Sequence, residues 1–395
     1  MKSRRSVLTA MLTVAALGAA APAALAAPAA HPAHPAPAVF ANPGAAEPSL
    51  SASLSPSARP VVAYVGPGGS LWVASATKAG KWHRTMLAKP GSADSAPSLV
   101  VVPTGQKAIA VEGPDHSLWF YAYLSGHWQH VRVSGHGTAY SAPSLYLGAD
   151  GAGIAVEGPH HSLYFDSLIG LETFSSQEVD NNVAYSAPSL VIRDSSQADT
   201  DDPAGEVDIA VQNARHSLSL FYNPGSGWVN DVIGAPGKNY SAPSLIVFAG
   251  LGSAQGTALI AVEGPHHSLR SYIRFGTTDL FGTLKGRGWV YSAPTVSEGD
   301  SETLLPIAFQ SRNHSLGLVF DKSLGSGTWK SDPVSVIRTA YSAGSIVLSP
   351  SGELYIAVQG AGNSLRLSKA AQAAPGHAPQ FTGKMIAGPG TTFGG

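Results

Sequence analysis

The chain has 395 residues, too many for one ordinary hydrophobic core, so it must fold as several domains or as an array of repeats. Lysine and arginine together number 24 and aspartate and glutamate 25, a balance that argues against nucleic acid or an anionic membrane as a partner. Cysteine is absent, which excludes disulfides, thiolate catalysis and cysteine-ligated metals.

The N-terminus has the pattern of an export signal. A positively charged start at residues 2–5 precedes an apolar stretch at 7–21, and the Ala-Leu-Ala segment at 24–26 offers a small-residue cleavage site. The arginine pair in the charged start is typical of twin-arginine signals, while the rest fits the general Sec pathway equally well. We therefore expect residues 1–26 to be a signal peptide of one of these types and the mature protein to be secreted and extracellular.

The next segment has the composition of a linker. Residues 27–42 are mostly Ala, Pro and His, with too little apolar bulk for a core and a bias towards polyproline II. No later stretch approaches the ~20 apolar residues that a membrane-spanning helix needs, so no membrane span is expected. The folded domain is predicted to occupy residues 43–395.

A decapeptide of the type Ile-Ala-Val-Glu-Gly-Pro-x-His-Ser-Leu recurs through this domain. Successive copies start about 45 to 55 residues apart, which is the spacing of propeller blades and similar repeat units. The copies lie at residues 62–71, 109–118, 154–163, 209–218, 260–269, 307–316 and 356–365.

Each decapeptide lies between two other recurring elements. A Ser-Ala-Pro-Ser-Leu segment precedes it, and because proline belongs at the start of a strand, this segment predicts an innermost strand A. The decapeptide itself predicts strand B, a polar hairpin turn and the start of strand C. An aromatic residue is then expected to open strand D in every repeat. These aromatic residues are Trp82, Trp128, Phe174, Trp228, Phe281, Trp329 and Phe381.

Four short antiparallel strands per repeat, repeated seven times, predict an all-β, seven-bladed β-propeller. The first repeat begins near residue 43, and the chain ends where a further Tyr-Ser-Ala-Pro would follow. We expect the first and last blades to lie side by side and close the ring. A mixed blade built from both ends of the chain is the alternative.

This layout of a Ser-Ala-Pro entry, Ile-Ala-Val-x-Gly, a polar turn with Ser-Leu and a following tryptophan resembles the seven-bladed propeller lectins of bacteria and fungi. The resemblance covers about the whole mature chain. It implies a propeller fold and binding of fucose or of methylated or acetylated sugars, with glycans or cell-surface glycoconjugates as partners.

Two sets of residues are candidates for ligand binding. The first is a histidine that recurs at one position of the decapeptide, where it could donate to a sugar hydroxyl or hydrogen-bond the local backbone, as Gly69 and Asn363 at that position suggest. The second is an aromatic residue at the start of strand C. The two sets are His116, His161, His216, His267 and His314, and Trp72, Trp119 and Tyr164. No metal site and no cofactor is predicted.

A glutamate that ends strand B in some repeats could be mistaken for a catalytic acid. It is Glu112, Glu157 and Glu263 in three repeats, but glutamine takes its place in three others. Because glutamine cannot supply a proton, this exchange argues against acid–base catalysis. The side chain is expected to hydrogen-bond the neighbouring Ser-Ala-Pro-Ser segment.

These features favour a secreted, non-catalytic module that binds carbohydrate at several equivalent sites. The main alternative is a cell-envelope propeller that binds proteins or has a structural role without binding sugar. An exported hydrolase is a third reading, for which the sequence pairs no acidic residue with a nucleophile or a base.

Overall fold

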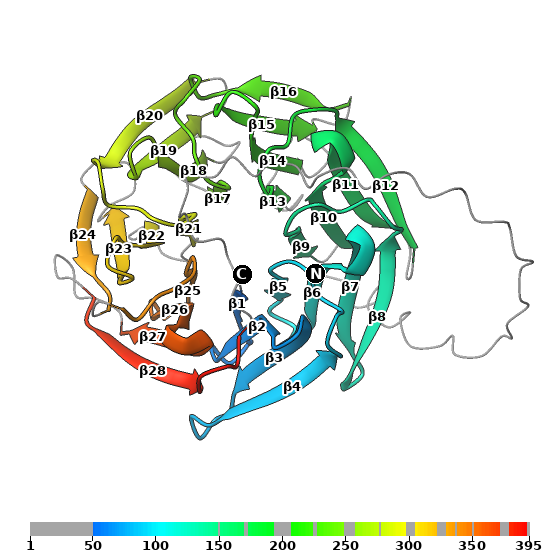
Figure 1. Cartoon of the computed structure of the whole chain (residues 1–395), viewed down its shortest axis with the longest axis vertical. Coiled ribbons are helices and arrows are strands. Elements are labelled where there is room, and N and C mark those ends of the chain that lie inside the picture. Colours follow the sequence, from blue (N-terminus) through cyan, green and yellow to red (C-terminus); the bar gives the residue numbers. More distant parts are fainter. Residues whose placement is uncertain are drawn as a thin grey trace, which may run out of the picture.

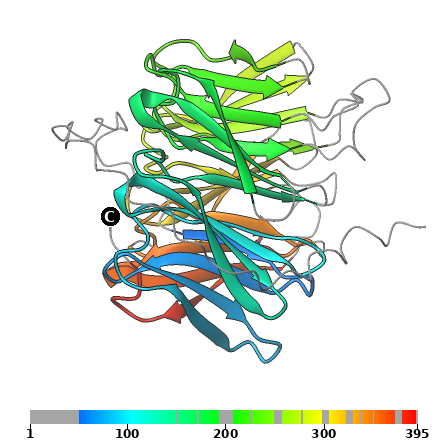
Figure 2. The same cartoon turned by 90° about the vertical axis from the view of Figure 1, so that its right-hand side faces the viewer.

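The computed structural model describes residues 50–392 apart from 149–150, 170–172, 193–206, 224–226, 249–256, 276–277, 298–304, 322–328, 336–337, 350 and 372–378. Seven four-stranded antiparallel sheets form a closed ring, with strand A of each sheet at the centre and strand D at the rim (Figure 1). Figure 2 shows the resulting disc from the side. The predicted seven-bladed β-propeller is confirmed. The predicted signal peptide (1–26) and linker (27–42) lie outside the described residues.

The strands follow chain order within each blade. Blades 1 to 3 comprise β1 (Leu50–Leu54), β2 (Pro60–Gly66), β3 (Ser70–Ala76) and β4 (Trp82–Ala88); β5 (Ser98–Val101), β6 (Lys107–Gly113), β7 (Ser117–Leu124) and β8 (His127–Ser134); and β9 (Ser144–Gly148), β10 (Gly151–Glu157), β11 (Leu163–Ile169) and β12 (Thr173–Asp180). Blades 4 and 5 comprise β13 (Ser189–Ile192), β14 (Val207–Gln212), β15 (Leu218–Asn223) and β16 (Val229–Val232); and β17 (Ser244–Phe248), β18 (Thr257–Gly264), β19 (Ser268–Phe275) and β20 (Thr278–Lys285).

Blades 6 and 7 comprise β21 (Thr295–Val296), β22 (Leu305–Gln310), β23 (Leu316–Asp321) and β24 (Trp329–Pro333); and β25 (Ser345–Leu348), β26 (Leu354–Gly360), β27 (Ser364–Ala370) and β28 (Phe381–Ala387). Short 3₁₀ turns join strands B and C in three blades: η2 (Pro114–His116), η3 (Pro159–His161) and η4 (Ala361–Asn363). Among the described residues, no helix has the length and apolar character needed to cross a membrane.

The hydrophobic core is divided among the seven junctions between blades. Each junction holds one cluster of buried side chains, for example Val61 and Leu71 of blade 1 against Leu99 and Ile109 of blade 2. The other six junctions are built in the same way. Because every strand B is buried on both faces, the Ile-Ala-Val of the decapeptide is almost continuously apolar.

The two serines of Ser-Ala-Pro-Ser have separate structural roles. The first accepts a hydrogen bond from strand B of its own blade, as Ser95 Oγ does from the Glu112 N–H at 3.2 Å. The second accepts one from strand A of the next blade, as Ser98 Oγ does from the Leu145 N–H at 3.0 Å. The motif therefore holds each blade together and also links it to its neighbour.

The ring closes by juxtaposition of the first and last blades. Strands β1 to β4 all come from the N-terminal end of the described chain and β25 to β28 all from the C-terminal end, so no blade is mixed. The Ala52 N–H donates to Ser345 Oγ at 2.9 Å across the closing junction. The same contact links each of blades 1 to 5 to the blade that follows it, and the closing junction has a core of its own.

Replacing Ser345 with alanine is expected to lower the free energy of unfolding by about 1 kcal/mol, because the N–H of the buried Ala52 loses its acceptor. Urea denaturation of Ser345→Ala and of the control Ser57→Ala measures the difference. Ser57 is exposed and shares its hydrogen bond with the Ser55 hydroxyl at the surface, so its variant should match the wild type. Equal midpoints for all three proteins would contradict a role for Ser345 in closing the ring.

The predicted strand-D aromatic is confirmed in six blades and wrong in blade 5. In blade 2, Trp128 pairs with Tyr123, five positions after the first leucine of strand C. In blade 5 the corresponding pair is Asp279 with Arg274, whereas Phe281 lies two residues further along the strand and is 70 % exposed. An ion pair thus replaces the expected aromatic wedge, since Arg274 Nε lies 3.4 Å from Asp279 Oδ1.

Candidate functional site

The recurring histidines lie in the turns between strands B and C. All five have a positive φ, between 52° and 61°, which is the left-handed region that glycine and asparagine tolerate best. This explains why Gly69 and Asn363 take the same position in blades 1 and 7. The backbone carbonyl of His116 accepts hydrogen bonds from the N–H groups of Thr138 and Ala139, both at 2.9 Å. The turn is thereby fastened to the connection between strand D and the next blade.

Each histidine side chain is held on two sides. His116 Nδ1 lies 2.7 Å from Glu112 Oε1, and the imidazole stacks on the Tyr140 ring with a centroid distance of 4.2 Å. The same Glu/Gln–His–Tyr arrangement recurs in five blades, with centroid distances of 3.9 to 4.6 Å. Blade 1 has lost all three members at once, since Val65, Gly69 and Asp94 stand in their places. We call this arrangement the latch.

The glutamate side chains have a different partner from the expected Ser-Ala-Pro-Ser segment. Their backbone N–H groups bond the Ser-Ala-Pro-Ser segment, but their side chains reach the histidine of the same hairpin. In blade 6, Gln310 Nε2 lies 3.1 Å from His314 Nδ1 and also donates to the Ala340 carbonyl at 2.7 Å, in the connection that precedes Ser342. Burial raises the pKa of Glu112 to about 7 and that of Glu157 to about 8.

The predicted strand-C aromatics share one position and one local contact. Trp72, Trp119 and Tyr164 each cover the glycine that precedes the proline of their turn, and a Cβ on Gly113 would lie 2.6 Å from the Trp119 ring. Where a side chain replaces this glycine, the strand-C residue is small, as with Asn213 opposite Ser219. The aromatic residue and the glycine therefore form one structural unit.

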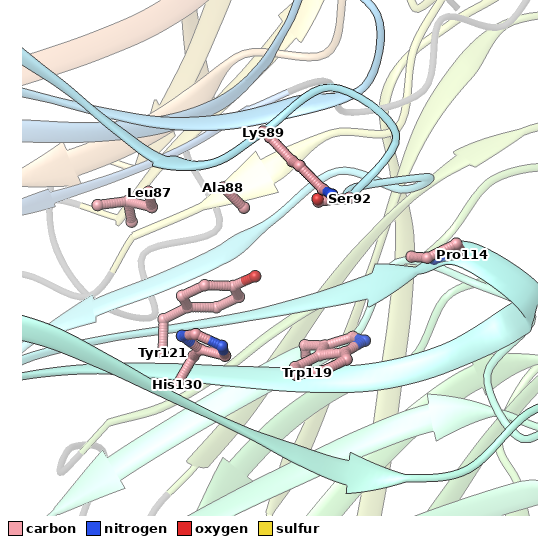
Figure 3. Close-up of a pocket in the computed structure, with 8 residues that line it drawn as sticks. All are labelled: Leu87, Ala88, Lys89, Ser92, Pro114, Trp119, Tyr121 and His130. Carbon is pink, nitrogen blue, oxygen red and sulfur yellow. The ribbon is translucent and has the colours of Figure 1, made fainter.

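A cleft of about 280 Å³ opens at the junction of blades 1 and 2 (Figure 3). Its two walls come from different blades, with β7 and β8 on one side and the end of β4 and the following connection on the other. The residues that line it are Leu87, Ala88, Lys89, Ser92, Pro114, Trp119, Tyr121 and His130. The volume is near the lower end of the roughly 300–1,000 Å³ typical of small-molecule sites.

The blade 2 wall of this cleft is aromatic and held in place. Trp119 Nε1 donates to Ser117 Oγ at 2.9 Å, and that hydroxyl donates to the Pro114 carbonyl at 2.8 Å, so the indole N–H is already used. The exposed His130 ring lies 5.7 Å from Trp119 and 5.4 Å from Tyr121, measured between centroids. The wall thus offers an indole face flanked by an imidazole.

The opposite wall adds polar groups. The exposed Lys89 and the half-buried Ser92 lie in the connection that leads from blade 1 to blade 2, and Figure 3 shows them across the cleft from Trp119 and Tyr121. A flat apolar face with a few polar groups around it is the arrangement that orients a small polar ligand. Sequence reasoning identified Trp119 but missed Lys89, Ser92, Tyr121 and His130.

The other predicted positions differ in their surroundings. Trp72 occupies the equivalent place at the junction of blades 7 and 1, where its Nε1 donates to Ser70 Oγ at 2.9 Å. Tyr164, at the junction of blades 2 and 3, donates its hydroxyl to Glu178 Oε2 at 3.1 Å. The cleft of blades 1 and 2 therefore contains one predicted residue, Trp119, while the five histidines belong to latches.

The central channel has a cavity of about 240 Å³ lined by the alanines, prolines and serines of the Ser-Ala-Pro-Ser segments, with no charged side chain in its lining. Within the described part of the chain, no group of three or more His, Asp or Glu residues is arranged to hold a metal ion.

No protein-family model and no curated protein matches the chain. Among solved structures, the BP39L lectin from Burkholderia pseudomallei matches with a TM-score of 0.70 at 15 % sequence identity, over 89 % of this chain and 99 % of that one. The chain shares the fold of propeller lectins. A variant of the Aleuria aurantia lectin in complex with Fucα1-6GlcNAc matches with a TM-score of 0.52 at 11 % identity, over 77 % of this chain and 98 % of that one.

The SapL1 lectin in complex with α-methyl fucoside is also similar, with a TM-score of 0.54 at 10 % identity, over 75 % of this chain and 97 % of that one. At these identities the likeness concerns the propeller-lectin fold. The side chains at the blade junctions are this chain's own, and they carry the functional argument.

Proposed function

We propose that this protein is a secreted, non-catalytic module that binds glycans at junctions between blades, with the cleft of blades 1 and 2 as its principal site. The observation that carries the proposal is the meeting of a fixed indole face with Lys89, Ser92 and His130 in one cleft of monosaccharide size. The propeller-lectin fold supports it, because lectins of that fold are solved in complex with fucosides.

The chemistry of the cleft suits a sugar ring. The C–H face of a pyranose is apolar and packs on an aromatic surface such as Trp119, while its hydroxyls need hydrogen-bond partners around the rim. Lys89 supplies donors, and Ser92 and His130 supply both donors and acceptors. Because the Trp119 N–H is already bonded to Ser117, the indole contributes its ring face. The hydrogen bonds that orient the sugar then come from Lys89, Ser92 and His130.

Trp72 gives the proposal a second site next to the first. It takes the place of Trp119 at the junction of blades 7 and 1, so two adjacent junctions carry an indole. A single shallow sugar site binds at about millimolar concentration, or about −4 kcal/mol. Two sites engaged by one branched glycan or glycan-coated surface gain roughly 10² to 10⁴ in avidity.

A non-catalytic role agrees with the placement of the carboxyl groups. Glu112 and Glu157 form latches, and glutamine replaces them in other blades. Burial raises the pKa of Asp166 to about 6. The residue is only 1 % exposed, so its carboxyl group is not accessible to a ligand from solvent.

Trp119→Ala is expected to weaken glycan binding at least tenfold, because the sugar loses its stacking surface. A glycan array identifies the ligand, and titration calorimetry compares the wild type with Trp119→Ala and with the control Gln129→Ala. Gln129 lies on the same strand as His130 but is exposed outside the cleft, so its variant should bind normally. Absence of glycan binding at millimolar concentrations would refute the proposal and favour a propeller that binds proteins.

A further inference from the structure

The turns of blades 4, 5 and 6 carry basic residues in pairs. In each blade, a backbone hydrogen bond joins the turn between strands B and C to the connection after strand D: Gly237 N–H to the Arg215 carbonyl, Gly288 N–H to the His266 carbonyl, and Arg338 N–H to the Asn313 carbonyl, at 2.8 to 2.9 Å. These bonds bring basic residues of the two segments together. The pairs are Arg215 with Lys238, His266 with Arg287, and Arg312 with Arg338.

All six of these side chains are exposed. Blades 4, 5 and 6 follow one another around the ring (Figure 1), and each pair lies at the end of its blade where strand B turns into strand C, so the pairs form a row on one face of the disc. We call this row the cationic arc. The near-neutral balance of the whole chain, 24 basic against 25 acidic residues, hides this local concentration.

Acidic residues are almost absent from the segments that build the cationic arc. In residues 212–217, 233–243, 263–268, 285–294, 310–315 and 333–344, Glu263 is the only carboxyl group, and it is fully buried against His267. Blade 2 is different, because its exposed Asp115 lies 3.3 Å from His136 at the same place. The positive charge of the cationic arc therefore lacks carboxylate partners in its own segments.

Exposed aromatic rings lie among these cations. Trp289, 47 % exposed, lies two residues after Arg287 in the chain and has Lys285 Nζ 5.0 Å from its ring centroid. Tyr341, 38 % exposed, follows Arg338 and is stacked on His314. Such rings offer apolar surface for the carbon faces of a sugar chain, while guanidinium groups match carboxylates and sulfates with paired hydrogen bonds.

We infer that the cationic arc binds a linear anionic polysaccharide, whose carboxylate or sulfate groups contact successive blades. This inference rests on the proposed glycan-binding function but uses different blades from the cleft of Trp119. A row of separated cation pairs suits a polymer with regularly spaced charges better than a small anion, which would meet only one pair. The partner is an acidic glycan rather than nucleic acid, because a single row on a near-neutral protein provides few of the phosphate contacts that a nucleic acid requires.

The test compares two triple variants with the same change in net charge. The first, Arg215→Gln, Arg312→Gln and Arg338→Gln, removes one arginine pair and half of another from the cationic arc. The control, Lys78→Gln, Lys81→Gln and Lys384→Gln, removes three exposed cations from blades 1 and 7. Binding is measured in about 0.1 M salt to heparin, which is sulfated, to polygalacturonate, which is carboxylated, and to neutral dextran.

The wild type is expected to bind at least one of the two anionic polymers and not dextran, with affinity falling as salt rises. The arc variant should lose at least tenfold in affinity and the control less than twofold. Heparin and polygalacturonate distinguish sulfate from carboxylate recognition. Both variants should keep wild-type affinity for the glycan that the array identifies for the Trp119 cleft, so failure of the two proposals can be told apart.

Three results would overturn the inference. One is equal loss in the two triple variants, which would mean that only net charge matters. Another is binding to neither anionic polymer. The third is tighter binding of single-stranded oligothymidylate than of either polysaccharide, which would assign the cationic arc and its exposed rings to nucleic acid.

Discussion

Replacing Phe309 with alanine is expected to lower the free energy of unfolding by about 3–5 kcal/mol. Phe309 is 2 % exposed and packs at the junction of blades 5 and 6 with Leu259 and Val319. Its ring also fills the space above Gly317, where a Cβ would lie 2.6 Å from a ring atom. Since the strands on both sides are fixed by their own hydrogen bonds, the cavity left by the ring cannot collapse easily.

Phe281→Ala provides the matched control for this prediction. The same chemical change at a residue that is 70 % exposed should alter the free energy of unfolding by less than about 0.5 kcal/mol. Urea denaturation followed by tryptophan fluorescence measures both variants. Similar losses for Phe309 and Phe281, or a stable Phe309→Ala protein, would contradict the assignment of the stability to the blade junctions.

The position of Phe281 on strand D was not predictable from the repeat. Alignment by aromatic residues alone placed it with Trp128, but backbone pairing places Asp279 there. A shift of two residues keeps the side chain on the same face of the strand, so alternation of polar and apolar residues does not reveal it. The hairpin between strands C and D varies in length among blades, and only the structure fixes its register.

The fold was predictable because each repeat contains the same local signals for strands and turns. Proline at the start of strand A, the doubly buried Ile-Ala-Val of strand B and the polar turn have local physical causes, and seven copies remove the ambiguity of any one. The separate roles of Ser95 and Ser98 were not predictable from the motif. Ser98 bonds Leu145 in the next blade, and no pattern within one repeat records such a partner.

The site was predictable only in part, for a related reason. Trp119 stands out because its position carries aromatic residues in several repeats. Lys89 and Ser92 belong to the preceding blade, and they meet Trp119 only when the ring is assembled. The role of the histidines had a signal within the sequence, since blade 1 lacks the histidine, the tyrosine and the glutamate together. Joint loss of three residues indicates one packed unit rather than three separate ligand contacts.

Glu157→Gln is expected to raise stability at alkaline pH and to flatten its pH dependence. Burial and repulsion by Glu112 raise the pKa of Glu157 to about 8 in the folded protein, against 4.5 for an unperturbed glutamate. The folded state therefore favours the protonated carboxyl. The stability that the protonated Glu157 carboxyl contributes is fully present below pH 4.5. It is lost as pH rises towards 8, at up to about 1.4 kcal/mol per pH unit.

Glutamine is a suitable replacement because the fold already uses it in this position. Gln212 Nε2 lies 2.8 Å from His216 Nδ1, the same contact that a protonated Glu157 makes with His161 at 2.7 Å. Burial lowers the pKa of His161, so its neutral ring can accept this hydrogen bond. The variant keeps the latch and removes the titrating group, and a gain of a few kcal/mol over the wild type at pH 8 is expected.

Denaturation curves at pH 5, 6.5 and 8 test this, with Gln212→Glu as the reciprocal variant. His161 is present in the wild type and in Glu157→Gln, so its own titration largely cancels in the difference between them. Gln212→Glu should introduce the opposite change and lose stability as pH rises, because it places a new carboxyl at a position that is 2 % exposed. Parallel curves for all three proteins would mean that these carboxyls ionise freely in the folded state and that burial does not control the latch.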